Sequence, residues 1–304
     1  MRVLITGIAG FIGSHLADRL LERGHEVTGI DNMTTGRKGN IPADVNFVYG
    51  HIANGFPLER AYAYAKPEVV YHCAANYKDP QHWQEDILTN ALGTAEVVKN
   101  ALRKDVRRIV YFQTSLCYGL HPDEQPISLE HPLRPSNSYA ISKTCGERYI
   151  AMSGLEFVSL RLANIYGPRN LSGPIPTFYK RLVAHEPCTV ASSRRDFVYV
   201  DDLIDVAVAA EGSEPGYYHV ASGRDYEIQD VFNEVRDAVG SDAKPRTIPH
   251  GSDDAPTLLL DPTRTLREFG WRASTPLTEG VPEAVAWYDE NGVGETYTHL
   301  SLKG

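Results

Sequence analysis

Tyr139 and Lys143 are the pair of residues whose types and spacing most directly suggest chemistry in this chain. On a helix, a separation of four residues is about one turn, so both side chains would lie on one face. A nearby ammonium favours the phenolate and lowers the pKa of a tyrosine from its usual value of about 10. Such a tyrosine can take a proton from an alcohol while hydride leaves the same carbon. The spacing is common by chance, so its meaning depends on the rest of the chain.

Three glycines near the start of the chain form a second candidate site. Gly7, Gly10 and Gly13 follow a short β-branched run and open a segment with helical apolar spacing. Glycines let the backbone approach a pyrophosphate, and a helix N-terminus offers free N–H groups. Asp31 ends the next predicted strand, where an acidic side chain can bind an adenosine ribose and repels a 2′-phosphate. The pattern predicts a dinucleotide site that prefers NAD to NADP, although Arg37 follows closely.

Hydroxyl and arginine side chains are candidates for binding a substrate. Thr114 and Ser115 lie at the end of a predicted strand, where a hydroxyl points into the crevice of an open α/β sheet. Arg195 lies in one of two arginine-containing segments, 161–169 and 194–203, and arginine can bind a phosphate through two hydrogen bonds. In an acidic protein these arginines favour an anionic substrate. The alternative is a network of surface ion pairs, and the sequence leaves both open.

The elements that would position these residues alternate between strands and helices. The expected strands are 3–6, 26–30, 69–73, 108–114, 157–162 and 217–221, and the expected helices are 11–23, 88–103 and 138–153. This order predicts an α/β fold, a Rossmann-type doubly wound parallel sheet with a smaller, interleaved C-terminal substrate lobe. We expect residues 1–165, with returns near 196–222, to form the NAD-binding domain. Residues 166–195 and 223–304 would form the lobe.

Composition narrows the class of protein. The chain has 304 residues, 30 basic and 39 acidic, and its net charge of −9 disfavours non-specific nucleic-acid binding. No stretch approaches the roughly 20 apolar residues of a membrane span, and the start MRVLITG lacks the pattern of a secretion leader. We therefore expect a cytoplasmic protein without nucleic-acid or membrane partners. The cysteines form no CxxC pair and have no histidine at zinc spacing, so no metal site is predicted.

Further motifs complete a fixed order along the chain. The segments are GIAGFIG, Asp31-Asn32, His72-Cys73-Ala74-Ala75, Asn90 with Gly93-Thr94, TSLCYG, YAISK, RLANIYGPR, RRDFVYVDDL and Gly270-Trp271. With this order the chain resembles the extended short-chain dehydrogenase/reductases, the nucleotide-sugar epimerase and dehydratase family, along nearly its full length. It is similar above all to epimerase-like enzymes encoded in bacterial O-antigen and surface-polysaccharide clusters.

The resemblance implies a role for each matched residue. Thr114 would be the catalytic hydroxyl, Tyr139 the acid/base, and Lys143 the partner that binds the nicotinamide ribose. The residues implied to contact the substrate are Ser115, Asn164 and Arg195. Of these, Asn164 and Arg195 would contact the diphosphate of the substrate. The residues implied to hold NAD are Gly7, Gly10, Phe11, Ile12, Gly13, Asp31, Asn32, His51, Ile52, Ala74, Ala75, Asn90, Tyr139 and Lys143.

The chain also departs from the family pattern. Dehydratases and decarboxylases of the family carry a carboxylate where this chain has Leu116. His51 replaces an acidic residue near the adenine, and segment 249–254 lacks a second arginine for the diphosphate. Cys117 is expected to be structural. We therefore expect an NAD-dependent epimerase acting at C4 of a nucleotide sugar, with a UDP-sugar favoured. The alternatives are a lyase, either a 4,6-dehydratase or a uronate decarboxylase, and a non-catalytic NAD(H)-binding regulatory protein.

The resemblance finally implies a homodimer. In the family, two helices from each subunit form a four-helix bundle, and here these would be 88–103 and 138–153. The second of these helices also carries the catalytic pair, so pairing would brace it. We expect Tyr149, Ile150 and Met152 to supply apolar bulk for the contact surface.

Overall fold

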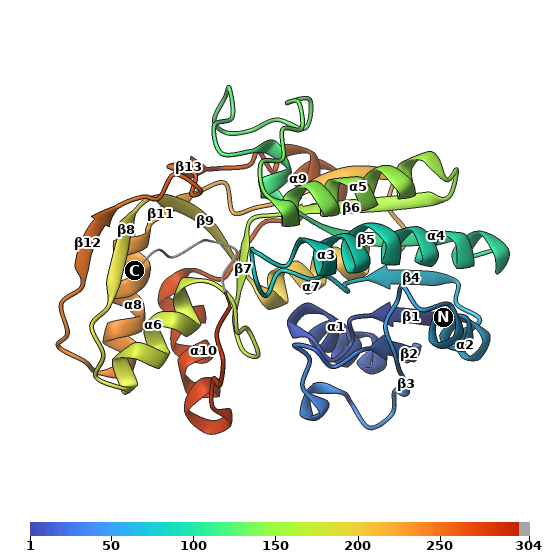
Figure 1. Ribbon diagram of the computed structural model, residues 1–304, viewed down its shortest axis with the longest axis horizontal. Helices are drawn as coiled ribbons and strands as arrows, with labels where there is room; N and C mark the ends of the chain where they lie inside the picture. The colour runs from blue at the N-terminus through green and yellow to red at the C-terminus, as the bar shows by residue number, and fades with distance from the viewer. Residues whose placement is uncertain (298–304) are drawn as a thin grey trace.

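The computed structural model places a large parallel sheet between two layers of helices and sets a smaller lobe beside it (Figure 1). It describes residues 1–297, so the end of the expected lobe, 298–304, lies outside the described part of the chain. Within residues 1–297, no helix combines the length and apolar character needed to cross a bilayer.

Seven parallel strands form the main sheet, in the order β10-β6-β5-β4-β1-β2-β3. The chain moves outward from β1 in one direction and then in the other, which is the doubly wound arrangement. Every strand expected from the sequence is present to within one residue at either end, and β3 is an additional edge strand. The bounds are β1 (Arg2–Thr6), β2 (Glu26–Asp31), β3 (Asn46–Tyr49), β4 (Val69–His72), β5 (Arg108–Thr114), β6 (Glu156–Leu162) and β10 (Gly216–Val220).

Helices cover both faces of this sheet. Val3 and Ile5 of β1 pack into a core with α1 and α7, whereas Leu4 packs into a second core with α2, α4 and α5. All three side chains are fully buried, as expected for the continuous apolar runs of a parallel strand covered on both sides. The bounds are α1 (Phe11–Glu22), α2 (Gly55–Ala65), α4 (Thr94–Arg103), α5 (Ser138–Met152) and α7 (Val200–Ala209).

The expected helix 88–103 is confirmed as helical, but its first half is a π-helical turn and only its second half is an α-helix. The helical stretch begins earlier with α3 (Trp83–Asp86) and then widens into a π-helical turn, η2 (Ile87–Gly93), before α4. The hydroxyl of Thr94 donates a hydrogen bond of 2.6 Å to the carbonyl of Asn90 at the end of this turn. Single π-helical turns of this kind are rare and concentrate at functional sites.

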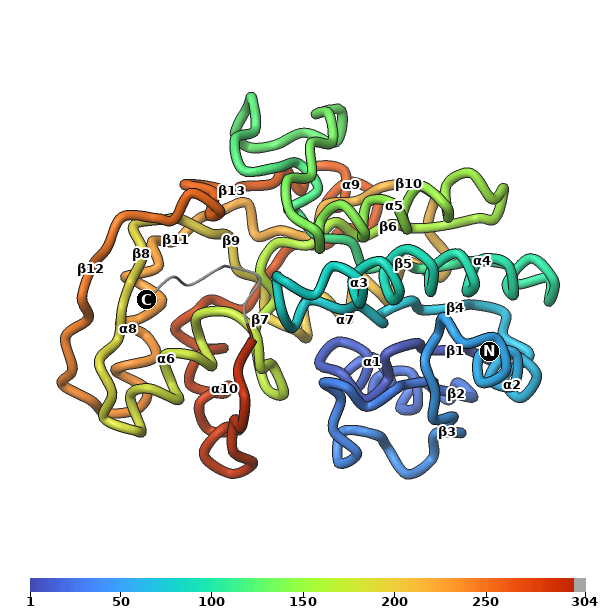
Figure 2. Tube along the Cα trace, in the orientation of Figure 1, coloured from blue at the N-terminus to red at the C-terminus, as the bar shows by residue number. Residues whose placement is uncertain are grey.

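The lobe is built from short strands and three packed helices. In Figure 2, helices α6 (Pro174–Val183), α8 (Ile228–Val239) and α10 (Leu277–Asn291) gather on the side away from β1–β3. Strand β9 belongs to the lobe, whereas α7 and β10 return to the main sheet. The remaining elements are β7 (Asn164–Tyr166), β8 (Thr189–Ser192), β9 (Arg194–Tyr199), β11 (Asp225–Glu227), β12 (Arg246–Pro249), β13 (Thr257–Leu258), α9 (Thr263–Phe269), η1 (Lys38–Asn40) and η3 (Ser115–Tyr118).

Candidate functional site

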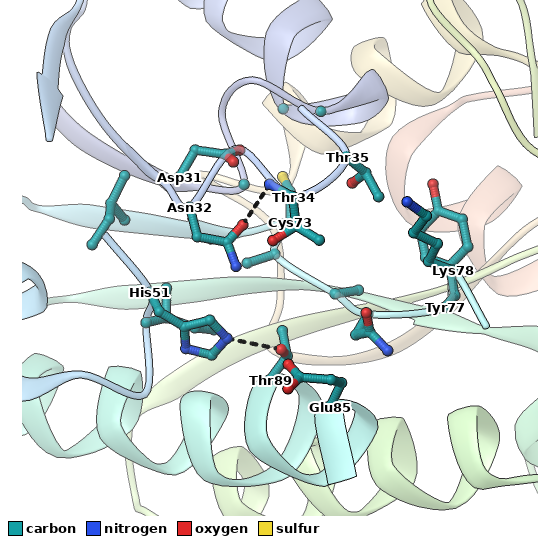
Figure 3. Close-up of a pocket in the computed structure, with 18 of the residues that line it drawn as sticks. Asp31, Asn32, Thr34, Thr35, His51, Cys73, Tyr77, Lys78, Glu85 and Thr89 are labelled. Atoms are coloured by element: carbon teal, nitrogen blue, oxygen red, sulfur yellow. Dashed lines mark hydrogen bonds between the residues drawn. The ribbon is translucent and has the colours of Figure 1, made fainter. Parts of the chain in front are cut away.

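A cavity of about 420 Å³ lies at the carboxyl ends of β1, β2 and β4 (Figure 3). We call it the glycine-loop cavity. Most of the residues expected to hold NAD line it, which places them together although they come from four separate segments of the chain. These residues are Gly7, Gly10, Phe11, Ile12, Gly13, Asp31, Asn32, His51, Ile52, Ala74 and Ala75.

The three glycines of this cavity serve different purposes. Gly7 has a φ of +71°, and a Cβ there would lie 2.7 Å from the backbone nitrogen of Ala74. A Cβ on Gly13 would lie 2.2 Å from the carbonyl oxygen of Gly7, so both positions are restricted by the protein's own backbone. A Cβ on Gly10 would meet only one atom, at 3.2 Å, so the space it leaves open belongs mainly to the cavity.

The N-terminus of α1 is suited to an anion. The helix begins at Phe11 with no side-chain cap and with no acidic residue in its first turn. Its first N–H groups are therefore available to a pyrophosphate, and the helix dipole favours the negative charge. Together with the open space at Gly10, this geometry fits a dinucleotide.

Asp31 ends β2 and is fixed by two backbone hydrogen bonds. The N–H of Ala9 donates to Oδ2 at 2.9 Å, and the N–H of Met33 donates to Oδ1 at 2.7 Å. Burial raises the pKa of Asp31, and these two N–H groups act in the opposite direction. Arg37, which could have attracted a 2′-phosphate, instead donates to the carbonyls of Gly292 and Val293. The arrangement matches the expected preference for NAD.

His51 occupies the position where the family carries an acidic residue. Its Nδ1 accepts a hydrogen bond of 3.0 Å from the N–H of Ala53, so the neutral ring carries its proton on Nε2 and donates to Thr89 Oγ1 at 3.0 Å (Figure 3). Burial lowers the pKa of His51. The ring is therefore held neutral, and it gives this end of the cavity no negative charge.

A second cavity, of about 210 Å³, adjoins the first and is called the tyrosine cavity. Phe11, Ile12 and Tyr77 line both cavities, so the two spaces meet at these residues. The expected residues that line the tyrosine cavity are Thr114, Ser115, Tyr139, Asn164 and Arg195. Among its lining residues in the described part of the chain, Arg195 is the only charged side chain. Leu116, at the position where dehydratases and decarboxylases of the family carry a carboxylate, also lines this cavity.

Tyr139 and Thr114 bring two hydroxyl groups to this cavity. Thr114 Oγ1 accepts a hydrogen bond from the N–H of Leu116 at 3.2 Å, which leaves its own proton free to be donated. The ring of Tyr139 lies edge-on to Tyr77, with 6.0 Å between ring centres. Burial raises the pKa of Tyr139, and Tyr77 and Asp86 raise it further. The expectation that Lys143 lowers this pKa is therefore not met in the protein alone.

Lys143 and Asn90 lie beside the cavities and line neither of them. The Lys143 amine lies 4.0 Å from the centre of the Tyr111 ring, and burial lowers the pKa of Lys143 to about 7. Asn90 Oδ1 accepts from the N–H of Asn76 at 2.8 Å, while Nδ2 donates to the Asn76 carbonyl and to Ser142 Oγ. Asn90 thereby ties the loop that carries Tyr77 to α5.

The arginines expected to bind an anion divide into two groups. Arg195 lines the tyrosine cavity, and its guanidinium is paired with Asp254 and donates to the carbonyl of Arg194 at 2.6 Å. Asn164, from the same cavity, donates to the Asp196 carbonyl at 3.1 Å. The other arginines are committed to ion pairs elsewhere, namely Arg161–Glu147, Arg169–Asp18 and Arg194–Asp225. All four arginines are thus in ion pairs, of which Arg161–Glu147 is buried, and Arg195 is the one of the four that also lines the tyrosine cavity.

A buried network fixes the helix that carries Tyr139. Glu147 of α5 accepts hydrogen bonds from Arg161 Nη2 at 2.9 Å and from Ser159 Oγ at 2.5 Å, both on β6. Arg161 Nη1 also donates to the hydroxyl of Tyr118 at 2.8 Å, and Tyr118 lies in η3, directly after Thr114 and Ser115. The Tyr118 hydroxyl then donates to His219 of β10 at 2.6 Å. The network locks α5 and η3 to the sheet.

Sequence reasoning missed three residues of the site. Tyr77 and Lys78 line the glycine-loop cavity (Figure 3), and buried Asp86 binds Asn76 Nδ2 at 2.8 Å. Their position in the sequence could have identified Tyr77 and Lys78, because they come shortly after the end of buried strand β4, much as Thr114 stands at the end of β5. Cys117, by contrast, is fully buried in an apolar cluster, and burial raises its pKa. No group of three His, Cys, Asp or Glu residues within 1–297 could hold a metal ion.

Comparisons with known proteins agree with this geometry. The chain is 47% identical to the Bordetella bronchiseptica enzyme WbmH, solved with NAD⁺, with a TM-score of 0.93 and coverage of 96% of this chain and 99% of that one. It is 43% identical to WbmG of the same organism, solved with NAD and UDP, with a TM-score of 0.91 and 99% of each chain covered. It is 32% identical to the UDP-glucose 4-epimerase of Mycolicibacterium smegmatis, covering 95% of this chain and 98% of that protein.

The family assignment follows from these matches. UDP-glucuronic acid decarboxylases are also among the matched relatives, so the matches include more than one reaction. Residues 3–221 match the model of the NAD dependent epimerase/dehydratase family. This segment contains both the glycine-loop cavity and most of the residues that line the tyrosine cavity. The chain is therefore an enzyme of the NAD dependent epimerase/dehydratase family and uses NAD as its cofactor.

Proposed function

We propose that this enzyme is a UDP-sugar 4-epimerase, with NAD in the glycine-loop cavity and the sugar in the tyrosine cavity. The observation that carries the proposal is the composition of the tyrosine cavity. It presents the Tyr139 and Thr114 hydroxyls and one arginine, and its described lining residues include no Asp or Glu. Such a cavity can move a proton on and off an alcohol but offers no carboxylate for elimination. The similarity to a structure with NAD and UDP supports the choice of nucleotide.

Each residue has a distinct part in this reaction. Bound NAD would supply the chemistry of accepting a hydride from C4 and returning it. Tyr139 takes the proton of the C4 hydroxyl and later returns one, while Thr114 donates a hydrogen bond to the same oxygen. Lys143, one helical turn from Tyr139, would bind the nicotinamide ribose, as the family resemblance implies. Arg195 and Asn164 bind the diphosphate, which requires the guanidinium to be shared between Asp254 and a phosphate.

The reaction can be tested by product mass. We expect purified protein incubated with a panel of UDP-, dTDP- and GDP-sugars to convert a UDP-sugar into an isomer of unchanged mass. Loss of water would identify a 4,6-dehydratase, and loss of carbon dioxide would identify a decarboxylase. A protein that binds NAD but converts none of the sugars would support the regulatory alternative. Either lyase outcome would show that a carboxylate outside the described lining reaches the sugar despite Leu116.

We also propose that the enzyme is a homodimer, paired through α3, η2, α4 and α5. These neighbouring helices pack together, and they leave large apolar side chains exposed. The exposed residues are Trp83, Ile87, Leu88, Leu92, Leu102, Ile141, Tyr149 and Met152. Large exposed apolar side chains gathered on neighbouring helices favour a contact site, and the four-helix pairing implied by the family resemblance makes a second copy its occupant.

One residue expected on that surface lies elsewhere. Ile150 is fully buried in the core beneath α5, whereas Ile141, which was not expected there, is 53% exposed. Helical periodicity explains the exchange, because residue 150 points inward when 141, 149 and 152 point outward. Light scattering at micromolar concentration should give twice the 33.7 kDa of one chain. A mass near that of one chain would contradict the proposal.

A further inference from the structure

Lys78 has an unusual position in the glycine-loop cavity. Among the described residues that line this cavity it is the only lysine or arginine, whereas Asp31, Asp79 and Glu85 contribute carboxylates. A dinucleotide brings the two negative charges of its pyrophosphate into this space. Lys78 is therefore the one lining side chain that can meet a phosphate oxygen with a charge-assisted hydrogen bond.

The chain crosses back toward this lysine after α10. We call residues 292–297 the C-terminal strap; the red end of the tube can be followed from α10 in Figure 2. Arg37, from the loop after β2, donates to the carbonyls of Gly292 and Val293 at 3.0 and 2.6 Å. Lys180, from α6 in the lobe, donates to the carbonyl of Gly294 at 2.7 Å. Cations from both parts of the molecule thus hold three successive carbonyls of the strap.

The outer half of the strap contacts Lys78 itself. Glu295 Oε2 lies 3.0 Å from Lys78 Nζ, and the same amine lies 5.2 Å from the centre of the Tyr297 ring. The hydrogen bond to Glu295 raises the pKa of Lys78, so the amine is charged at neutral pH. Tyr297 is fixed in turn, because its N–H donates to the Leu171 carbonyl and its carbonyl accepts from the N–H of Gly173, at 2.9 and 3.1 Å.

The strap therefore touches the rims of both cavities. Gly173 lines the tyrosine cavity, and Lys78 lines the glycine-loop cavity. The side chain of Lys78 is 36% exposed, so without its two strap partners the flexible amine would be free to sample solvent. Held between a carboxylate and an aromatic face, it stays at the cavity.

We propose that Lys78 is a cofactor-binding residue that retains the dinucleotide through its pyrophosphate, and that Glu295 and Tyr297 of the C-terminal strap are positioning residues for it. This role deepens the proposed epimerase function. An epimerase must keep its reduced cofactor beside the keto sugar until hydride has returned, so slow release of the dinucleotide is part of the reaction.

The proposal can be tested without any sugar. The dissociation of NADH is followed by the loss of bound-NADH fluorescence after mixing with excess NAD, in wild type, Lys78→Met, Lys78→Arg, Glu295→Gln and the Lys78→Met/Glu295→Gln double variant. We expect Lys78→Met to release NADH at least about tenfold faster, as for the loss of one charge-assisted hydrogen bond. Lys78→Arg should restore most of the retention, because the charge is kept.

The role of the strap is tested by asking whether the effects of the Lys78→Met and Glu295→Gln substitutions on NADH release add in the double variant. Glu295→Gln should speed release severalfold in wild type and have no further effect in Lys78→Met, because it acts through that amine. Lys38→Met, at an exposed lysine of η1, is the matched control and should release NADH at the wild-type rate. Unchanged release in Lys78→Met, or a full additional effect of Glu295→Gln in the double variant, would overturn the proposal.

This test separates the inference from the proposed reaction. Faster NADH release with no isomer formed from any UDP-sugar would uphold the strap and refute the epimerase. Isomer formation with unchanged NADH release in Lys78→Met would support the epimerase and refute the role of Lys78 and the strap. If both hold, the Lys78→Met protein given its UDP-sugar should also leak free NADH and keto sugar into solution, which the wild type should not.

Discussion

Burial of Lys143 places a large cost on the stability of the folded chain. Its side chain is 1% exposed, and burial lowers its pKa from an ordinary 10.5 to about 7. The unfolded chain therefore binds a proton below pH 10.5, whereas the folded chain binds it only below about pH 7. Because each pKa unit corresponds to about 1.4 kcal/mol, burying this lysine costs about 5 kcal/mol below pH 7 and nothing above pH 10.5.

Replacing the lysine should remove this cost. We expect Lys143→Met to lose turnover but to be more stable than wild type, with a difference that shrinks as the pH rises. From pH 7 to pH 9 the difference in free energy of unfolding should fall by about 2 kcal/mol, since the folded wild type is largely neutral at this residue by pH 9. The change in packing is the same at both pH values, so it cancels.

Urea unfolding of both proteins, freed of nucleotide and measured from pH 6 to 9, tests this expectation. Removing nucleotide matters because NAD stabilises whichever protein binds it more tightly. Lys38→Met, at an exposed lysine, should show no pH-dependent difference from wild type. A difference between Lys143→Met and wild type that stays constant from pH 6 to 9 would show that Lys143 titrates normally in the folded protein, and the reasoning from burial would be wrong.

Three further results are expected. Tyr139→Phe should lower turnover at least about a hundredfold with NAD still bound, whereas Tyr149→Phe, on the exposed side of the same helix, should stay within a few-fold of wild type. Denatured wild-type protein should release NAD or NADH, and NADP as the main nucleotide would contradict the role given to Asp31. Product formed in D₂O should carry no deuterium at C5, because Leu116 is not a base; incorporation there would indicate elimination chemistry or C5 epimerisation.

Much of the fold could be predicted because its signals are local. The apolar runs of β1 and β5 are continuous, and the glycines between β1 and α1 are only three residues apart. Asp31 and Thr114 could be placed at the site because the carboxyl ends of parallel strands share one edge of a sheet. These residues needed no knowledge of distant contacts.

The rest depends on partners that are far apart in the sequence. The π-helical turn η2 is held by Asn90 and Thr94, whose types alone do not reveal it. Arg195 was predicted at the site, but its ion pair with Asp254 joins residues that are 59 positions apart. Lys78 acquires its role only when the strap returns from the far end of the chain, through Glu295. Periodicity also failed for Ile150, because an apolar residue near a helix end can face either way.

Strand β10 has a consequence for how the enzyme is made. It completes the main sheet beside β6, yet it follows α6, β8 and β9 of the lobe in the chain. On the ribosome, the edge of β6 therefore stays unpaired until residue 220 has emerged, long after helix α5, which carries Tyr139, is complete. An unpaired edge is open to pairing with other chains. Because β10 follows lobe elements in the chain, no single truncation separates the main sheet from the lobe. We expect an expressed fragment ending near residue 165 to aggregate.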